Sequence, residues 1–132
     1  LRKYRKDAVS QRCAFVSYDS YASKKNIEIK LNTLLSTILI EESNSESEKT
    51  ELVPTNTLDN FFIDHGIRHL DLLILDVEGY EIQVLEGYKR DQSVINFMLV
   101  EAWDFETFDS YAKSRNWKFI KHIGTDHLYS LK

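Results

Sequence analysis

An apolar run that ends in two acidic residues is the strongest constraint on the fold of this chain. Leu72 to Leu75 is continuously apolar and leads directly into Asp76-Val77-Glu78-Gly79, with helical patterns before it (Leu58 to His65) and after it (Glu81 to about Tyr88). A short, fully apolar strand is typical of a parallel sheet that is covered on both faces. Open α/β sheets bind ligands at the carboxyl ends of their strands. We therefore expect the two carboxylates to lie at a ligand-binding edge.

The second half of the chain repeats this alternation of strand and helix. Phe97 to Val100 is another apolar strand, and it too ends in a carboxylate, Glu101. A helix is expected from Asp104 to about Asn116, with apolar side chains at core-facing spacing. Trp117 to Ile123 and His127 to Leu131 are two short strands joined by a turn. The pattern predicts an α/β sheet that ends in a β-hairpin.

The helix before the acidic strand has clear end signals. Thr55, Asn56 and Thr57 offer side-chain oxygens that can cap a helix from about Leu58 to His65. Gly66 is placed to end that helix in a left-handed conformation.

The first half of the chain is less regular. Leu1 to about Ala8 is charged and compatible with a helix, and Arg12 to Tyr18 is a short apolar run that predicts a strand. Ile27 to Leu31 alternates apolar and charged residues, as a half-exposed strand does, and Leu34 to Ile40 fits either a helix or a strand. Glu41 to Glu51 has no large apolar residue, so we expect a solvated, mobile loop within a single domain.

Composition and charge limit which partners and which cellular compartment we expect for this protein. The chain has 132 residues, enough for one domain with a buried core, and a net charge of −4 that gives no electrostatic case for nucleic acid or an anionic membrane as partner. Cys13 is the only cysteine, which excludes an internal disulfide and a zinc-thiolate cluster. No apolar run reaches membrane-spanning length, and we expect a cytoplasmic protein. Because the chain starts at Leu1 and its only methionine is Met98, we also expect it to derive from a longer or processed protein.

A series of motifs in fixed order resembles one known family. The motifs are Val53-Pro54-Thr55-Asn56-Thr57-Leu58-Asp59, then the strand and acidic turn from Asp71 to Glu81, then Val84-Leu85-Glu86-Gly87, and last the strand that ends at Glu101. They resemble the FkbM family of S-adenosylmethionine-dependent methyltransferases. The resemblance is strong from Val53 to Glu101, extends to Lys132, and is faint before Ile40. It implies a single methyltransferase domain over residues 1–132, with an FkbM-like core from about 53 to 132 and S-adenosylmethionine as methyl donor.

One motif of that family is missing from this sequence. Family members hold S-adenosylmethionine with a glycine-rich loop after their first strand, whereas the four glycines here are Gly66, Gly79, Gly87 and Gly124. The resemblance implies a Rossmann-like class I sheet with strand order three-two-one-four-five-seven-six and an antiparallel seventh strand. If Arg12 to Tyr18 is strand three and Leu72 to Asp76 is strand four, strands one and two are missing and the sheet is N-terminally incomplete. The residues before Ile40 should then be loosely placed, or fill the gap by pairing strand three with strand four.

The resemblance also assigns roles to three carboxylates. Methyl transfer is an in-line displacement that needs positioned reactants and, for a hydroxyl acceptor, removal of a proton. Asp76 is the first choice for positioning the reactants and for binding the cofactor, Glu78 for contacting the acceptor or acting as general base, and Glu101 is the third catalytic candidate. A purely structural alternative is that Glu78 and Glu81 only favour the N-terminus of the following helix through its dipole.

No metal site is expected from the histidines. His65 and His69 are four residues apart, as in a helical metal-binding pair, but Gly66 and the loop between them interrupt the helix that such a pair needs.

Three functions are consistent with this sequence. The first is an O-methyltransferase acting on a small-molecule hydroxyl acceptor, a sugar or small metabolite, present here without its cofactor loop and inactive by itself. The second is a non-catalytic remnant, or a module that depends on a partner carrying the missing N-terminal half of the domain. The third is another α/β enzyme that binds a divalent metal at the acidic strand end. A titration would separate the three, since binding of S-adenosylmethionine supports the first, absence of binding the second, and stabilisation by a metal the third.

Overall fold

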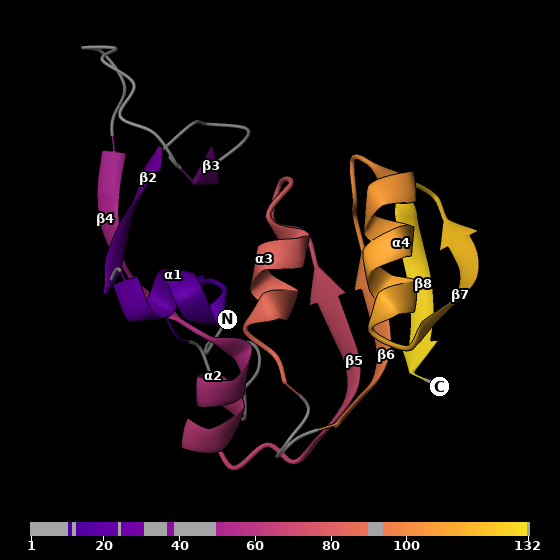
Figure 1. The fold of residues 1–132 in the computed structure, drawn as a ribbon, viewed down its shortest axis with the longest axis horizontal. Coiled ribbons are helices and arrows are strands. Elements are labelled where there is room, and N and C mark those ends of the chain that lie inside the picture. Colours follow the sequence, from indigo (N-terminus) through magenta and orange to yellow (C-terminus); the bar gives the residue numbers. More distant parts are fainter. Residues whose placement is uncertain are drawn as a thin grey trace, which may run out of the picture.

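The computed structural model describes residues 11, 13–23, 25–30, 37–38, 50–89 and 94–131. Within these residues the chain forms two four-stranded sheets and four helices, which confirms the predicted α/β class. Figure 1 shows the two sheets side by side with α3 (Glu81–Glu86) between them. None of the helices in the described part is long and apolar enough to cross a membrane.

The second sheet carries the acidic strand. Its strands are β5 (His69–Leu75), β6 (Val94–Val100), β7 (Trp117–Ile123) and β8 (Asp126–Leu131), in the order β5-β6-β8-β7. β5 and β6 are parallel, and β8 is antiparallel to both of its neighbours. The predicted apolar strands and the closing hairpin are therefore confirmed.

Helices α3 and α4 (Phe105–Ser114) pack on one face of this sheet (Figure 1). Val84 of α3 and Phe108 of α4 belong to one buried cluster with Met98 and Tyr129 of the sheet. Both helices fall on the same face because the chain crosses the sheet in one direction and each crossover is right-handed.

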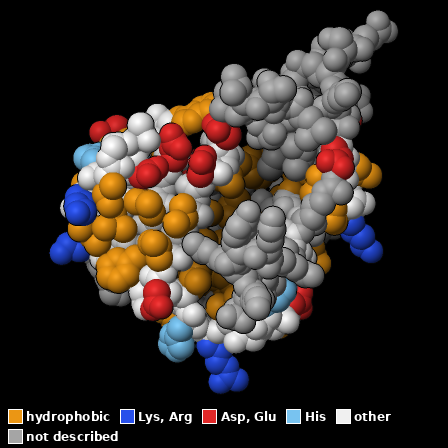
Figure 2. Space-filling model, turned by 180° about the vertical axis from the view of Figure 1, so that it is seen from behind, with side chains coloured by type: hydrophobic (Ala, Val, Ile, Leu, Met, Phe, Trp, Pro, Cys, Tyr) orange, Lys and Arg blue, Asp and Glu red, His pale blue; other side chains and the backbone are white. Residues whose placement is uncertain are grey.

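The opposite face of this sheet is exposed, contrary to the expectation that the apolar strand is covered on both sides. Leu72 and Ile74 of β5 are 43% and 65% exposed, and Phe97, paired with Leu72 across the sheet, is 44% exposed. Figure 2 shows hydrophobic side chains gathered on the face seen from behind. The crossover rule explains the error, since it sends α3 and α4 to one side and leaves this side of β5 without a helix among the described residues.

The first sheet has the order β1-β4-β2-β3. Its strands are β1 (Ala14–Phe15), β2 (Asn26–Lys30), β3 (Thr37–Ile38) and β4 (Thr50–Asn56). β1 runs parallel to β4, whereas β2 is antiparallel to β4 and to β3. The half-exposed strand predicted near Ile27 is thus confirmed as β2, and the ambiguous stretch from Leu34 to Ile40 contributes the two residues of β3.

Two predictions for this half are wrong. The strand predicted from Arg12 to Tyr18 is only two residues long, because the chain turns after Val16 and Tyr18 begins helix α1 (Tyr18–Ser23). The loop predicted from Glu41 to Glu51 does not include its last two residues, Thr50 and Glu51, which are paired with β2. The rest of that loop and the helix predicted from Leu1 to Ala8 lie outside the described residues.

Direct pairing of the strands predicted as three and four, one of the two outcomes expected for an incomplete sheet, is not found in the described part of the chain. β1, which lies in the run predicted as strand three, pairs with β4, while β5, which contains the run predicted as strand four, pairs with β6. The two strands belong to different sheets, and β5 forms an edge of its own sheet.

Helix α2 (Leu58–Asp64) begins and ends where the sequence indicates. The Thr57 hydroxyl accepts a hydrogen bond from the backbone N–H of Asn60 at 3.2 Å, and His65 follows as the C-terminal cap residue. Gly66 has a φ of +64°, the left-handed conformation predicted for it. These end signals are local, and the structure confirms them.

Candidate active site

The turn that follows β5 has an unusual backbone. Glu78 and Gly79 have φ values of +54° and +91°, so two successive residues lie in the left-handed region. Gly79 tolerates this conformation because it lacks a Cβ, whereas a non-glycine residue such as Glu78 adopts it less readily. The Gly79 N–H donates a hydrogen bond to Oε1 of Glu81 at 2.9 Å, and the Glu81 side chain is buried. Glu81 therefore fixes the turn, in addition to lying in the first turn of α3.

A cavity of about 380 Å³ lies between β1 and β5, beside this turn. We call it the inter-sheet cavity. Its apolar wall comes from both sheets and from α2 and α3, and includes Phe15, Leu58, Leu73, Ile74, Val77 and Val84. Its polar groups include Asp76, Glu78 and Tyr80, so it combines an apolar wall with carboxylates at the carboxyl end of β5. That location is the usual ligand-binding edge of a parallel sheet.

Two of the three predicted site residues are brought together there. Asp76 is exposed, Glu78 is half-buried, and both line the inter-sheet cavity. Glu101 follows the neighbouring strand β6, where its backbone N–H donates to the Leu75 carbonyl at 3.0 Å. Its side chain is not among those that line this cavity.

Cys13 lines the same cavity from the β1 side. Burial raises the pKa of its thiol. The thiol therefore stays protonated at neutral pH, and among the described lining residues the acidic side chains are those of Asp76 and Glu78.

A second cavity, of about 310 Å³, lies on the other side of the acidic turn. We call it the Trp103 cavity. Gly79, Glu81 and Gln83 line it from the turn and α3, and Trp103, Asp104 and Thr107 line it from the start of α4. The two cavities thus share the acidic turn as a wall, since Asp76 to Glu78 face one and Gly79 and Glu81 face the other.

Asp104 keeps its negative charge in this second cavity. Its two carboxylate oxygens accept hydrogen bonds from the backbone N–H of Thr107 at 3.1 Å and from the Thr107 hydroxyl at 2.6 Å. These bonds, the hydroxyl one first, lower the pKa of Asp104 below its usual value. The sequence predicted a helix that begins at Asp104 but did not single out Trp103, although an aromatic residue directly after the end of a strand can indicate a binding site.

The described part of the chain holds no cluster of three or more His, Cys, Asp and Glu residues that could bind a metal ion. His65 follows the end of α2 and His69 begins β5, so the two do not lie on one helix. The His65 Nδ1 lies 2.8 Å from the carbonyl oxygen of Phe61, within hydrogen-bonding distance.

The fold and these cavities define an α/β protein with a carboxylate-bearing site at the carboxyl end of a parallel strand. The family model described as methyltransferase FkbM domain matches residues 7–129, and the chain belongs to this methyltransferase family. No curated protein and no solved structure matches the chain.

Proposed function

We propose that this chain is the C-terminal part of a Rossmann-like class I methyltransferase domain. In this proposal the domain transfers a methyl group from S-adenosylmethionine to a hydroxyl of a sugar or small metabolite. The observation that carries the proposal is that Asp76 and Glu78 line one cavity at the carboxyl end of β5. The order β5-β6-β8-β7 with an antiparallel β8 supports it, because a class I sheet has this order in strands four, five, seven and six.

The residues of the inter-sheet cavity suit S-adenosylmethionine in two respects. When bound, this cofactor supplies a methyl group on a positively charged sulfur. Asp76 and Glu78 provide negative charge for the cationic end of the molecule, and Phe15, Leu58 and Val77 provide an apolar wall. The chain has no glycine-rich loop after a first strand, so the remaining contacts would come from the missing N-terminal half of the domain.

Each carboxylate has a distinct role in the proposed reaction. Asp76 holds the cationic donor beside the acceptor, which supplies the positioning that an in-line displacement requires. Glu78 accepts the proton that the acceptor hydroxyl loses as its oxygen bonds to the methyl carbon; the bond from that carbon to the donor sulfur breaks, and S-adenosylhomocysteine leaves. The left-handed backbone at Glu78 and Gly79 sets where that carboxylate lies relative to β5.

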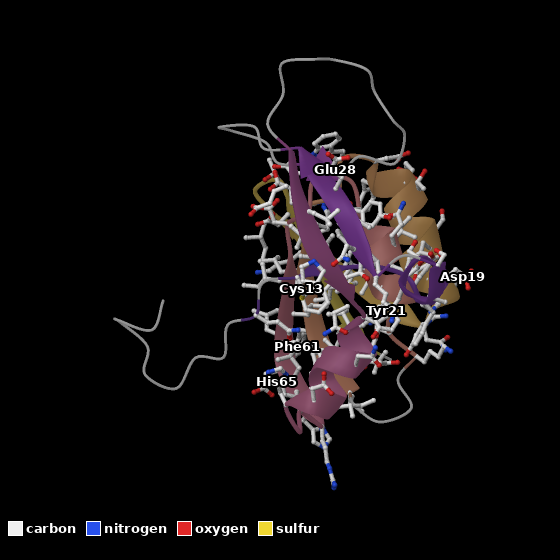
Figure 3. All side chains as sticks on the ribbon, turned by 90° about the vertical axis from the view of Figure 1, so that its left-hand side faces the viewer. Cys13, Asp19, Tyr21, Glu28, Phe61 and His65 are labelled. Atoms are coloured by element: carbon white, nitrogen blue, oxygen red, sulfur yellow. The ribbon has the colours of Figure 1, made fainter. Side chains whose placement is uncertain are left out.

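A calorimetric titration of the full chain with S-adenosylmethionine tests the proposal. Asp76→Asn should weaken binding by about tenfold or more, because hydrogen bonds to charged groups contribute about 1.5–3 kcal/mol. Glu78→Gln should leave more of the binding intact but lower methyl transfer by roughly a hundredfold or more. Glu28→Gln is the matched control, since Glu28 is an exposed carboxylate on β2 that is not among the residues lining this cavity, and Figure 3 shows it apart from Cys13.

The same titration decides between the proposal and its alternatives. Absence of binding by the unmodified chain favours a non-catalytic module, or one that needs a partner with the missing half. Among the described residues β5 forms an edge of its sheet, and this edge and the positions of the four glycines support that second function. Stabilisation by a divalent metal but not by S-adenosylmethionine would favour a metal-dependent α/β enzyme.

A further inference from the structure

Trp103 is exposed at the mouth of a cavity that the proposed donor site does not use. Its side chain is 69% exposed, whereas the other tryptophan, Trp117, is 2% exposed and lies in the core. Leaving a large aromatic ring in water is unfavourable, and exposed apolar surface beside a cavity often marks a binding site.

The indole of Trp103 is held against the acidic turn. A Cβ built on Gly79 would lie 3.8 Å from Cε3 and 4.0 Å from Cζ3 of the ring, which is ordinary van der Waals distance. The ring therefore packs over the backbone of the turn, and that turn is fixed by the hydrogen bond from Gly79 to Glu81. The aromatic face is thus presented on an ordered element, next to the wall that the two cavities share.

The groups around the indole are mainly hydrogen-bond acceptors. Each oxygen of the Asp104 carboxylate accepts one bond from Thr107 and has capacity for another. The Gln83 amide can both donate and accept. A flat apolar surface beside such acceptors suits a saturated ring that has an apolar C–H face and outward hydroxyl groups, because the negative face of an aromatic ring attracts polarised C–H groups.

We infer that the Trp103 cavity binds a pyranose ring of the methyl acceptor. The sugar stacks its C–H face on the Trp103 indole, and its hydroxyls donate hydrogen bonds to Asp104 and accept from or donate to Gln83. Its assignment as the acceptor rests on the proposed function, whereas its binding at Trp103 does not. A ring held there lies on the other side of the acidic turn from Asp76 and Glu78, so the hydroxyl that is methylated belongs to a part of the acceptor that reaches past this turn into the inter-sheet cavity.

A cationic ligand is the main competing occupant, since tryptophan faces also attract cations. Both carboxylates of this cavity already accept hydrogen bonds, Glu81 from Gly79 and Asp104 from Thr107. Their charge is partly compensated, which favours a neutral ligand with hydroxyl donors. Tetramethylammonium is the probe that separates the two cases.

The experiment is a fluorescence titration of the full chain with methyl α-D-glucopyranoside, methyl β-D-galactopyranoside and methyl α-L-rhamnopyranoside. Trp117 is buried, so a saturable change reports on Trp103. Saturation-transfer NMR on the same sugars extends the test to variants without the indole. Trp103→Ala should weaken binding by about tenfold, and Trp103→Phe by less, in line with the contribution of an aromatic contact. Leu52→Ala is the matched control, because Leu52 is 66% exposed, close to the value for Trp103, but lies on β4.

Each outcome has a fixed meaning. Saturable binding of at least one pyranoside that depends on Trp103 supports the inference. No response to any of the three sugars, binding that persists in Trp103→Ala, or a response to tetramethylammonium alone overturns it. Calorimetry with S-adenosylmethionine tests the proposed function independently. If the chain binds a pyranoside but not S-adenosylmethionine, the sugar site is supported and the proposed methyl transfer is contradicted.

Discussion

The Tyr18 hydroxyl donates a hydrogen bond to the carboxylate of Asp59, forty-one residues further along the chain. The same Asp59 oxygen accepts from the backbone N–H of Lys89 at 2.9 Å, and the Lys89 Nζ lies 3.9 Å from the centre of the Tyr18 ring. One side chain in the first turn of α2 therefore connects α1 to the segment after α3. The motif Thr57-Leu58-Asp59 thus has a structural role, with Thr57 as cap and Asp59 as the connection.

Replacement of Asp59 should destabilise the fold. Asp59→Ala removes two hydrogen bonds to a carboxylate and should lower the free energy of unfolding by about 2–4 kcal/mol. Urea denaturation followed by circular dichroism measures this. Asp64→Ala, which removes an exposed carboxylate at the other end of the same helix, should change stability by no more than about 0.5 kcal/mol. Equal effects of the two substitutions would show that Asp59 does not connect these elements.

Gly87 allows two backbone segments to approach each other. A methyl group at this position would press on the carbonyl oxygen of Val16 and come within 3.2 Å of the Thr57 Cβ. Because backbone cannot yield as a flexible side chain does, Gly87→Ala should cost about 3 kcal/mol, the upper end for overpacking.

A second glycine separates crowding from backbone strain. Gly124 has a φ of +64° but no atom within 4 Å of an added Cβ, so Gly124→Ala should cost about 1 kcal/mol from strain alone. The two variants are compared by their urea midpoints. If Gly87→Ala proves no worse than Gly124→Ala, the close approach of Val16 does not constrain the fold.

The sequence predicted best those features that depend on neighbouring residues. The cap at Thr57, the helix end at Gly66 and the closing hairpin all follow from local signals, and the structure confirms them. The strand β4 was missed because Thr50 and Glu51 are ordered by pairing with Lys30 and Ile29 of β2, twenty residues or more earlier in the chain. The acidic composition of a segment indicates that it is exposed to solvent, but it does not show whether a strand far away in the sequence will pair with it.

In the candidate site, too, the sequence predicted features set by neighbouring residues and missed features set by backbone conformation and packing. The sequence placed Asp76 and Glu78 at the end of a buried strand, and both line the inter-sheet cavity. It did not predict that Glu81 would accept a hydrogen bond from Gly79, because that contact needs two left-handed residues in succession. It also did not predict that the Glu101 side chain would lie outside this cavity, because the orientation of that side chain depends on how β6 packs beside β5.

Alkaline pH should destabilise the protein through Tyr129. Its hydroxyl is buried and donates to Asp109 at 3.4 Å, and burial together with that carboxylate raises the pKa of the phenol. Below the ordinary tyrosine pKa of about 10 both states are protonated and stability is unaffected. As pH rises above that value the unfolded chain loses the proton first, so the free energy of unfolding falls.

Urea denaturation at a series of alkaline pH values measures this effect. Tyr129→Phe should reduce the fall in stability with pH, because the substitution removes the group that ionises in the unfolded chain. Tyr21→Phe is the control, since Tyr21 is exposed in the folded protein. A fall in stability that is the same in all three proteins would exclude Tyr129 as its source.

The exposed face of the second sheet should promote self-association, and one substitution tests this. Ile74 is 65% exposed beside Leu72 and near Phe97, so its apolar side chain adds to a continuous apolar surface on β5 and β6. Ile74→Lys should decrease association at high protein concentration, measured by light scattering, and change unfolding in urea by less than about 1 kcal/mol. Leu52→Lys is the matched control, because Leu52 is 66% exposed but lies on β4 in the other sheet. If both variants decrease association equally, general surface charge is the cause, whereas an effect confined to Ile74→Lys identifies the face formed by β5 and β6.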